Sequence, residues 1–414
     1  MKGFSSRTSV DEALAWIDSV STPFERLATE TVSLNDAASR ILADDIISSV
    51  NVPGFDRSMM DGYALLSEQS YGATAYNALP LKIIGTSLPG RPYPGTVTPG
   101  TAVRIMTGAP MPDGADAVLP AEYSTMQEHT VHVMAEVSAG KHVGTTGEDI
   151  RCGGTVLSRG RLLRPQDVGV LSSIGCATIP VIRKPTVHIL ITGNELLPAG
   201  SCPQGYQIAD SNGPMLQALV SRDGGIPKLS GIIPDDRDSL LAALQQPADI
   251  VLISGGSSVG QEDHAPQLLA EHGTLAIHGI AMRPSSPAGM GQFRSQLVFL
   301  LPGNPVSCLC AYDFFAGRAI RAAGGRGKDW PYRPITATLT RKLVSAVGRV
   351  DYARVKFHQH LGTGATTDVT AEPIAISGAS LLTSTTQADG FIVIPPDSEG
   401  YAAQSVVSVF LYEQ

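Results

Sequence analysis

Hydroxyl, glycine and acidic residues in the segment 254–265 follow a buried-type apolar run, and residues of these types could bind phosphate. The run consists of the four consecutive apolar residues 250–253, which indicate a strand that then breaks at Ser254-Gly255-Gly256. Two glycines after a strand expose backbone N–H groups and let them approach an anion closely. Asp263 follows nine residues after Ser254, close enough to bring a carboxylate to the same pocket rim.

The same layout occurs twice more in this half of the chain. Residues 187–195 form an apolar run and a Thr-Gly turn that ends in Glu195, and residues 297–307 form a run, a Pro-Gly-Asn-Pro turn and Ser307. Three such runs predict one parallel sheet whose loops gather at its carboxyl edge. Open α/β sheets bind their ligands at that edge.

Acids also lie beside glycine turns in the first half of the chain. Asp56 and Asp61 flank Ser58, Thr107 precedes a glycine, and residues 147–150 place two acids after another glycine. Each acid alone more often caps a turn than binds a ligand. As a set they suggest a site for a divalent metal and phosphate, because Mg²⁺ is commonly held by one or two carboxylates and phosphate oxygens.

Composition excludes several classes of protein. The chain has 414 residues, 43% of them hydrophobic, and a net charge of −8, which argues against a general nucleic-acid surface. We find no run long enough to span a membrane and no secretory signal. The five cysteines include no C-x-x-C pair, so a reduced, cytoplasmic setting fits best. Neither a G-x-S-x-G elbow nor a G-x-x-x-x-G-K-[ST] loop is present.

The elements that position these residues predict a multidomain α/β plus β protein. We expect a central three-layer α/β domain with a parallel-type sheet, a β-rich insertion domain, a discontinuous domain and a C-terminal β domain. The expected domains are residues 1–52 with 144–180 (discontinuous), 53–143 (insertion), 181–326 (α/β) and 330–414 (C-terminal).

Helical patterns can be placed more finely. Ser9 and Glu12 form a capping box that begins the first helix. Cys308 and Cys310 lie in a helix-forming run and are expected to be buried as small hydrophobic residues. Further helices are expected at residues 34–46, 164–175 (ended by Gly175), 211–225 and 235–246.

Taken together, these motifs resemble the molybdopterin molybdenumtransferase family, the MoeA proteins and the gephyrin E-domain. The resemblance runs through nearly the whole chain in the order of the family. It rests on the motifs VPGFDRSMMDGYA, RIMTGAP, GEDI, ITGNE, IADSN, GIIPDD, SGGSSVGQED and LPGNPVS.

The resemblance implies an elongated protomer that dimerises, in which residues 1–52 with 144–180 form an elongated domain for linking and dimerisation and the C-terminal domain is β-barrel-like. It places the active site between the α/β domain of one subunit and the β insertion of the other. It implies molybdenum cofactor biosynthesis: insertion of molybdate into adenylylated molybdopterin, with Mg²⁺-dependent release of AMP. Small-molecule substrates and a homodimer are the expected partners, with a molybdoenzyme or other cofactor-biosynthesis proteins as further candidates. No nucleic acid or membrane is expected.

The resemblance also implies the roles of particular residues. Four acids are expected to act in catalysis and in binding the metal, across a subunit boundary: Asp61, Glu195, Asp235 and Asp263. The expected substrate-binding residues are Thr107, Asp210, Ser211, Asn212, Ser254, Gly255, Gly256, Pro302, Gly303, Asn304 and Pro305. The expected oxyanion-binding residues are Arg283, Ser307, Arg349 and Arg354. Which of the acids ligate Mg²⁺ directly stays open.

One segment departs from the family pattern. The family usually reads K-P-G-K-P where this chain reads MRPSSP, so that Arg283 and Ser286 replace two lysines. An arginine can hold two oxyanion oxygens, whereas Ser286 brings no charge. We expect Arg283 to reach the pocket bounded by Pro302 and Ser307. The alternative function is therefore a catalytically weakened paralogue that binds molybdopterin as a carrier or scaffold, and tungstate as the oxyanion also stays open.

Overall fold

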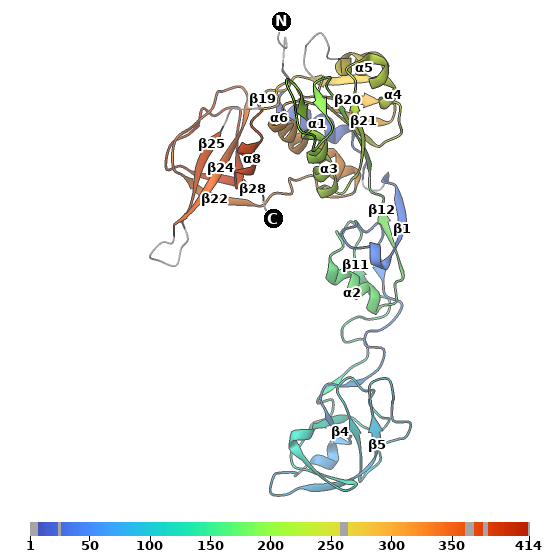
Figure 1. The fold of residues 1–414 in the computed structure, drawn as a ribbon. Coiled ribbons are helices and arrows are strands. Elements are labelled where there is room, and N and C mark those ends of the chain that lie inside the picture. Colours follow the sequence, from blue (N-terminus) through green and yellow to red (C-terminus); the bar gives the residue numbers. More distant parts are fainter. Residues whose placement is uncertain (1–6, 24–25, 257–263, 361–367, 376–379, 413–414) are drawn as a thin grey trace. The chain divides into compact units, whose positions relative to one another are not determined.

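The computed structural model describes residues 7–23, 26–256, 264–360, 368–375 and 380–412. Its contacts divide the chain into two compact units, of residues 31–181 and of residues 1–30 with 182–414 (Figure 1). Each unit contains buried apolar clusters. Among the described residues, no helix is long and apolar enough to cross a membrane.

The unit of residues 31–181 is built around a six-stranded sheet with the order β7–β4–β6–β5–β9–β8. Along its strand β9 the side chains alternate between buried and partly exposed, as the sequence predicts, since Val131 and Val133 are both fully buried. The strands are β4 (Gly62–Leu65), β5 (Leu79–Ser87), β6 (Thr101–Ile105), β7 (Ala117–Pro120), β8 (Ser124–Gln127) and β9 (Thr130–Val133).

Short ladders and one helix make up the rest of this unit. Helix α2 (Pro165–Ser173) is followed by Gly175 at a φ of 81°, a left-handed conformation that suits glycine at a helix end. The ladders pair β2 (Ile46–Ile47) with β11 (Thr155–Leu157), β3 (Arg57–Ser58) with β10 (Val143–Gly144), and β1 (Thr29–Ser33) with β12 (Thr178–Ile182).

The prediction of a helix over residues 34–46 is wrong. Only a single turn of 3-10 helix forms there, at Leu34–Asp36. Ile41 and Leu42 instead make bridges with Leu162 and Val181, and Leu42 is fully buried. Pairing with segments more than a hundred residues away therefore overrides the local helical pattern.

The other unit contains a six-stranded sheet with the order β16–β13–β17–β21–β20–β18. The first four strands are parallel, and β20 and β18 are antiparallel additions. The strands are β13 (Thr186–Thr192), β16 (Ile226–Ile233), β17 (Ile250–Ser254), β18 (Thr274–His278), β20 (Gly289–Phe293) and β21 (Gln296–Leu301).

Helices cover both faces of this sheet, which makes the three layers that the sequence predicts. Alternate residues of β17 face opposite sides: Leu252 packs with helices α1, α3, α6 and α7, and Ile253 packs with α4 and α5. The helices are α1 (Val10–Val20), α3 (Asn212–Arg222), α4 (Arg237–Leu244), α5 (His264–His272), α6 (Pro305–Ala311) and α7 (Gly317–Ala323), with a π-helical turn, η5 (Tyr312–Ala316), between the last two.

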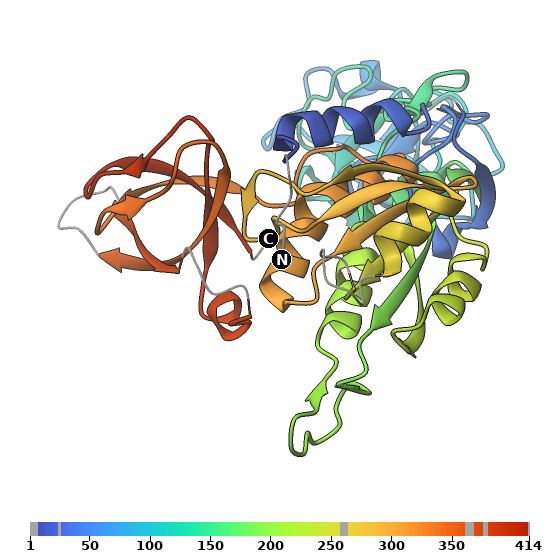
Figure 2. The ribbon, with the colours of Figure 1, turned by 90° about the horizontal axis from the view of Figure 1, so that it is seen from above.

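A closed barrel occupies the C-terminal part of the same unit. Its strands run β24–β25–β22–β28–β26, and β26 pairs back with β24, so the barrel closes; the strands lie in orange and red in Figure 2. Its Tyr352 and Phe391 belong to the same buried cluster as the α/β core. The strands are β22 (Pro334–Leu339), β24 (Val350–His360), β25 (Asp368–Ala375), β26 (Gly390–Ile394) and β28 (Val406–Leu411), with β19 (Met282–Arg283) added beside β24.

The predicted fold class is confirmed. The capping box of Ser9 and Glu12 begins α1 as expected, and α3 and α4 lie within the helical patterns at 211–225 and 235–246. Cys308 and Cys310 are fully buried, also as expected. The division into four domains at the stated boundaries stays a prediction.

Candidate active site

A cavity of about 770 Å³ lies at the carboxyl ends of β13, β17 and β21, the edge that the three apolar runs predict. Its acidic residues are Glu195, Asp210 and Asp235. The lining residues are Ile191, Thr192, Gly193, Glu195, Leu196, Ile208, Ala209, Asp210, Ser211, Asn212, Asp235, Ser254, Gly255, Gly256, Pro287, Pro302, Gly303, Asn304, Pro305, Ser380 and Leu382.

Glycine is required where β17 ends in this cavity. Gly255 has a φ of 102°, and a Cβ atom there would lie 2.3 Å from the carbonyl oxygen of Thr192 on the neighbouring strand. Its backbone N–H donates to the carbonyl oxygen of Leu301 at 3.3 Å, which ties the ends of β17 and β21 together. The Gly255 amide is therefore used within the fold, and Gly256, with a φ of 54°, is the next glycine of the turn.

Asn212 connects three of the predicted substrate-binding segments. Its Nδ2 donates to Ser254 Oγ at 2.9 Å and to the carbonyl oxygen of Gly303 at 2.8 Å. These bonds join the start of α3 to the last residue of β17 and to the turn after β21. Asp210 has a structural part in the same segment, since its Oδ1 accepts from the Gly213 amide at 2.9 Å in the first turn of α3.

Two of the four predicted catalytic acids, Glu195 and Asp235, line the cavity together. Asp235 is held by Asn194, whose backbone N–H donates to its Oδ2 at 3.1 Å. The described residues contain no group of three or more His, Cys, Asp or Glu side chains arranged to hold a metal ion. Asp263 lies outside the described residues.

Asp61 belongs to the unit of residues 31–181, where the structure brings it together with Thr107. The backbone N–H and the hydroxyl of Thr107 both donate to Asp61 Oδ1, each at 2.7 Å. These two hydrogen bonds lower the pKa of Asp61, because they stabilise the ionised carboxylate. The pair therefore presents a fixed, charged carboxylate on an exposed turn.

Comparison with known proteins decides the family. A model of the MoeA N-terminal region (domain I and II) matches residues 8–175, a "Probable molybdopterin binding domain" matches residues 188–322, and the MoeA C-terminal region (domain IV) matches residues 336–412. The chain belongs to the MoeA family.

Individual relatives are similar to this chain over nearly its full length. Molybdopterin molybdenumtransferase 2 of Mycobacterium tuberculosis is 33% identical over 391 residues, covering 92% of this chain and 94% of the relative. Molybdopterin molybdenumtransferase of Haemophilus influenzae is 33% identical over 387 residues, 92% and 93% of the two chains. The crystal structure of the molybdopterin biosynthesis MoeA protein from Pyrococcus horikoshii has a TM-score of 0.80 at 32% identity, covering 98% of this chain and all of that one.

The oxyanion residues that the MoeA resemblance implies lie differently from our expectation. Arg283 and Arg349 both form ion pairs with Asp351, which is fully buried and also accepts a hydrogen bond from Ser345. Among the described residues, neither arginine lines the cavity. The expected reach of Arg283 into the pocket is therefore not seen in this structure, because its charge is directed to an internal carboxylate.

The two other predicted oxyanion residues are buried. Arg354 has no exposed surface on β24, and Ser307 is 4% exposed in α6. The backbone oxygen of Ser307 accepts from the Ser285 hydroxyl at 2.6 Å, which links the departing segment MRPSSP to α6. Pro287, at the end of that segment, does line the cavity. Oxyanion binding by these residues stays a prediction.

Sequence reasoning missed several residues of the cavity wall. Thr192 comes directly before the glycine of the ITGNE motif, and its place at a strand end could have indicated it. Ser380 and Leu382 come from the C-terminal part of the chain, and no local pattern places them here. Cys308 lies behind the wall, 3.6 Å from Ser254 Oγ, and burial raises the pKa of its thiol to about 12.

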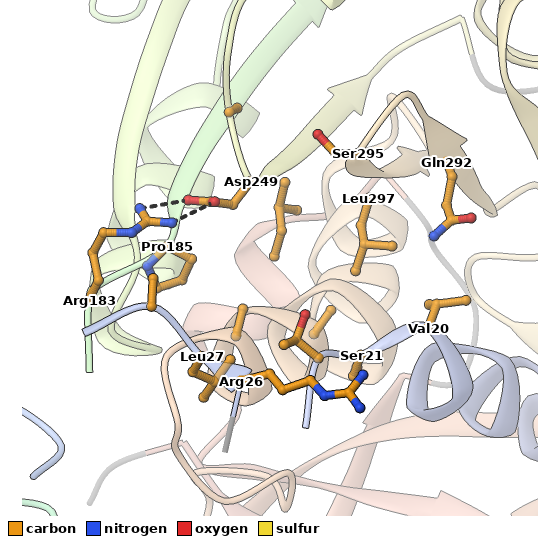
Figure 3. Close-up of a pocket in the computed structure, with 16 residues that line it drawn as sticks. Val20, Ser21, Arg26, Leu27, Arg183, Pro185, Asp249, Gln292, Ser295 and Leu297 are labelled. Carbon is orange, nitrogen blue, oxygen red and sulfur yellow. Dashed lines mark hydrogen bonds and ion pairs between the residues drawn. The ribbon is translucent and has the colours of Figure 1, made fainter. Parts of the chain in front are cut away.

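A second cavity, of about 330 Å³, lies at the amino ends of the same sheet (Figure 3). Two of its charged groups are paired with each other: Arg183 donates to both oxygens of Asp249, at 2.7 and 3.0 Å. The Asp249 carboxylate also accepts from the Thr186 backbone N–H at 2.7 Å and from the Thr186 hydroxyl at 2.9 Å. The charges of Arg183 and Asp249 are therefore already bonded within the fold.

Proposed function

We propose that this protein acts in molybdenum cofactor biosynthesis as a molybdopterin molybdenumtransferase. The proposed reaction inserts molybdate into adenylylated molybdopterin and releases AMP in a Mg²⁺-dependent step. The observation that carries this proposal is the cavity at the carboxyl edge, which combines Glu195, Asp235, a glycine turn and the Pro-Gly-Asn-Pro turn in a member of the MoeA family. Full-length relatives are named for this activity.

The residues of the cavity fit a magnesium ion that is shared with the substrate. Mg²⁺ is usually held by one or two carboxylates together with substrate phosphate oxygens and water, so Glu195 and Asp235 suffice without a third acid. When bound there, Mg²⁺ would neutralise negative charge that develops on the phosphate groups as AMP leaves. Asp263 stays a candidate ligand by its place in the sequence.

The chain's own groups would orient the substrate around this point. Gly256 would offer its backbone amide to a phosphate oxygen, and no side chain at Gly255 hinders the approach. The turn from Pro302 to Pro305 would form a rigid wall, because each proline fixes its backbone. The Asn212 amide ties this wall to the glycine turn, so both would keep their places during the reaction.

We further propose a homodimer in which the Asp61–Thr107 pair of one subunit completes the cavity of the other. The fixed carboxylate of Asp61 on an exposed turn supports this proposal. Mixing Asp61→Asn subunits with Glu195→Gln subunits tests it. If the site is shared, random mixed dimers recover about a quarter of wild-type activity although each variant alone is inactive. No recovery in verified mixed dimers would place Asp61 outside a shared site.

A second candidate function is a carrier or scaffold that binds molybdopterin and inserts molybdenum weakly. The observation that favours it is the pairing of Arg283 and Arg349 with the buried Asp351, together with the uncharged Ser286 in the same segment. Asp351 compensates only one of these two positive charges, but the ion pairs direct both guanidinium groups toward it, and this weakens their attraction for an oxyanion.

A single-turnover assay separates the two functions. Adenylylated molybdopterin and Mg²⁺ are mixed with the protein, with and without molybdate, and AMP release and cofactor formation are followed. The transferase releases AMP and forms molybdenum cofactor when molybdate is present. AMP release without cofactor formation at saturating molybdate supports the carrier. Failure to bind or cleave the adenylylated substrate at all would contradict both functions.

A further inference from the structure

Two buried polar atoms in the cavity wall have no hydrogen-bond partner among the described residues. They are Oδ1 of Asn212 and Oγ1 of Thr192. Asn212 is 7% exposed and Thr192 is 6% exposed, and both line the cavity. Buried polar atoms are nearly always bonded, so an unbonded pair beside a cavity indicates groups that a ligand would satisfy.

The orientation of the Asn212 amide is fixed by its neighbours. The carbonyl oxygen of Gly303 can only accept a hydrogen bond, so the atom that faces it at 2.8 Å must be the Nδ2 donor. A second bond from Nδ2 to Ser254 Oγ uses the other amide proton. Oδ1 is therefore the free atom, and it can act only as an acceptor.

The hydroxyl of Thr192 lies beside a position where the chain has no side chain. A Cβ atom at Gly255 would come within 2.7 Å of Thr192 Oγ1, so any residue other than glycine would crowd this hydroxyl. Thr192 is at the last position of β13, and Asn212 is at the first position of α3. A hydroxyl that can donate or accept thus lines the same cavity as an acceptor that cannot donate.

We propose that Thr192 Oγ1 and Asn212 Oδ1 recognise the amino-bearing edge of the substrate's nitrogen heterocycle. This inference rests on the proposed function and names the part of its substrate that these atoms bind. An acceptor-only oxygen repels phosphate and molybdate oxygens but accepts an N–H donor, and the Thr192 hydroxyl in the same cavity wall can bond a neighbouring ring nitrogen or oxygen. Adenine and pterin rings both carry an amino group beside such an atom.

Replacing Thr192 with valine gives the decisive test, because valine keeps the shape and removes the hydroxyl. We expect the affinity for the heterocycle to fall about tenfold, the effect of one lost hydrogen bond in a buried site. Thermal unfolding of the ligand-free protein should occur at an unchanged or higher temperature, since a buried hydroxyl without a partner is removed. Thr192→Ser keeps the hydroxyl and should keep most of the affinity.

Thr186→Val is the matched control, at the other end of the same strand. Its hydroxyl is already bonded to Asp249, so this variant should unfold at a lower temperature and bind ligands as the wild type does. The two threonine variants should therefore show opposite results. If Thr192 had only a structural role, Thr192→Val would unfold at a lower temperature and bind ligands as the wild type does, as expected for Thr186→Val.

Matched ligands show which ring is bound. Calorimetry with Mg²⁺ compares AMP with purine riboside 5′-monophosphate, which lacks the 6-amino group, and pterin-6-carboxylate with lumazine-6-carboxylate, which lacks the 2-amino group. If adenine is the ring, the wild type binds AMP more tightly than the purine riboside, and Thr192→Val weakens both, because the hydroxyl bonds a ring atom that both carry. If the pterin is the ring, the same pattern appears for pterin-6-carboxylate and lumazine-6-carboxylate, and the purine ligands are unaffected.

Two outcomes would overturn the inference. One is an unchanged affinity of Thr192→Val for both AMP and pterin-6-carboxylate; the other is a wild-type protein that binds neither amino-bearing ligand more tightly than its amino-free partner. In either case, wild-type release of AMP from adenylylated molybdopterin would leave the proposed function in place. A wild-type protein that neither binds these ligands nor releases AMP would overturn both.

Discussion

The two ends of the parallel strands β13, β17 and β21 hold cavities of opposite character. At the carboxyl ends, buried polar atoms of Thr192 and Asn212 have no partner among the described residues. At the amino ends, Asp249 is bonded by Arg183 (Figure 3) and also by Thr186. Strand β13 thus begins with a threonine whose hydroxyl is bonded and ends with one whose hydroxyl has no partner among the described residues.

The polar groups at the two ends of this sheet therefore have different parts: those at the amino ends stabilise the fold, and those at the carboxyl ends are available to a ligand. Bonded charges at the amino ends hold the strand starts together, and their hydrogen bonds are complete without a ligand. Unbonded groups at the carboxyl ends cost stability in the free protein, because a buried polar atom without a partner loses its bonds to water. A ligand that supplies the missing bonds would recover that free energy as affinity.

The largest effect is expected from the acids at the carboxyl ends. Glu195→Gln and Asp235→Asn should each reduce AMP release by on the order of a hundredfold, since stabilisation of charge in the transition state is lost. Binding of the adenylylated substrate should fall much less. Single-turnover AMP release and equilibrium binding measure the two quantities separately.

Asp238→Asn is the control for this prediction. Asp238 is an exposed carboxylate in the first turn of α4, close in sequence to Asp235 but not a residue of the cavity wall. It should keep wild-type rates. An equal loss of rate in Asp238→Asn, or equal losses in binding and AMP release for the cavity acids, would contradict a specific role in the chemical step.

A smaller effect is expected from Gly255→Ala. Alanine there must adopt a φ of 102° and place its Cβ against the Thr192 carbonyl oxygen, so the backbone must move. We expect at least about tenfold weaker binding of AMP, because the turn that receives the substrate shifts. The protein should also be less stable by about 1 kcal/mol or more.

Gly231→Ala separates backbone strain from displacement of the site. Gly231 has a φ of 81°, and a Cβ atom added there would meet no other part of the chain within 4 Å. This control should lose stability by about 1 kcal/mol and bind AMP normally. If Gly255→Ala binds AMP as well as Gly231→Ala does, the approach of the two strand ends is not needed for the ligand.

The sequence predicted this edge of the sheet well, because the information is local. Each apolar run followed by a glycine turn marks a strand end, and the strand order then brings Glu195 and Ser254 to one cavity. The fold class followed from the same alternation of strands and helices. Such patterns depend on residues close together in the chain.

What the sequence could not predict depends on partners far along the chain. Arg283 was expected at the pocket, but Asp351, which is 68 residues away, holds it in an ion pair. The segment at 34–46 has a helical pattern, but Ile41 and Leu42 bridge to segments more than a hundred residues away instead. Tertiary partners decided both positions.

At the amino ends, Asp249→Asn should lower stability and leave binding unchanged. Burial acts to raise the pKa of Asp249, but hydrogen bonds from Arg183 and Thr186 outweigh it and lower the pKa below its ordinary value. Asparagine keeps only part of these bonds, so we expect a loss of about 1–2 kcal/mol in the free energy of unfolding, reduced by partial exposure.

The sign of the pH dependence follows from that lowered pKa. The stabilisation is complete above the pKa of the unfolded chain and is lost as the pH falls through the lower pKa of the folded protein. The difference in stability between wild type and Asp249→Asn should therefore shrink in acid. Denaturant unfolding at neutral and acidic pH measures it, and a difference that grows in acid would contradict the assignment.

The smallest effects are expected from the open wall of the amino-end cavity. Arg26 is exposed there and Gln292 is half-buried, and both line the cavity (Figure 3). Arg26→Glu reverses a charge and Gln292→Ala removes an amide, yet neither group belongs to the Arg183–Asp249–Thr186 bonds. Each variant should change the free energy of unfolding by no more than about 0.5 kcal/mol. Calorimetry should show unchanged binding of AMP and of molybdate, because both ligands are assigned to the carboxyl ends. A clear loss of either affinity in Arg26→Glu would show that the amino-end cavity also takes an anion, and the contrast between the two ends would then fail.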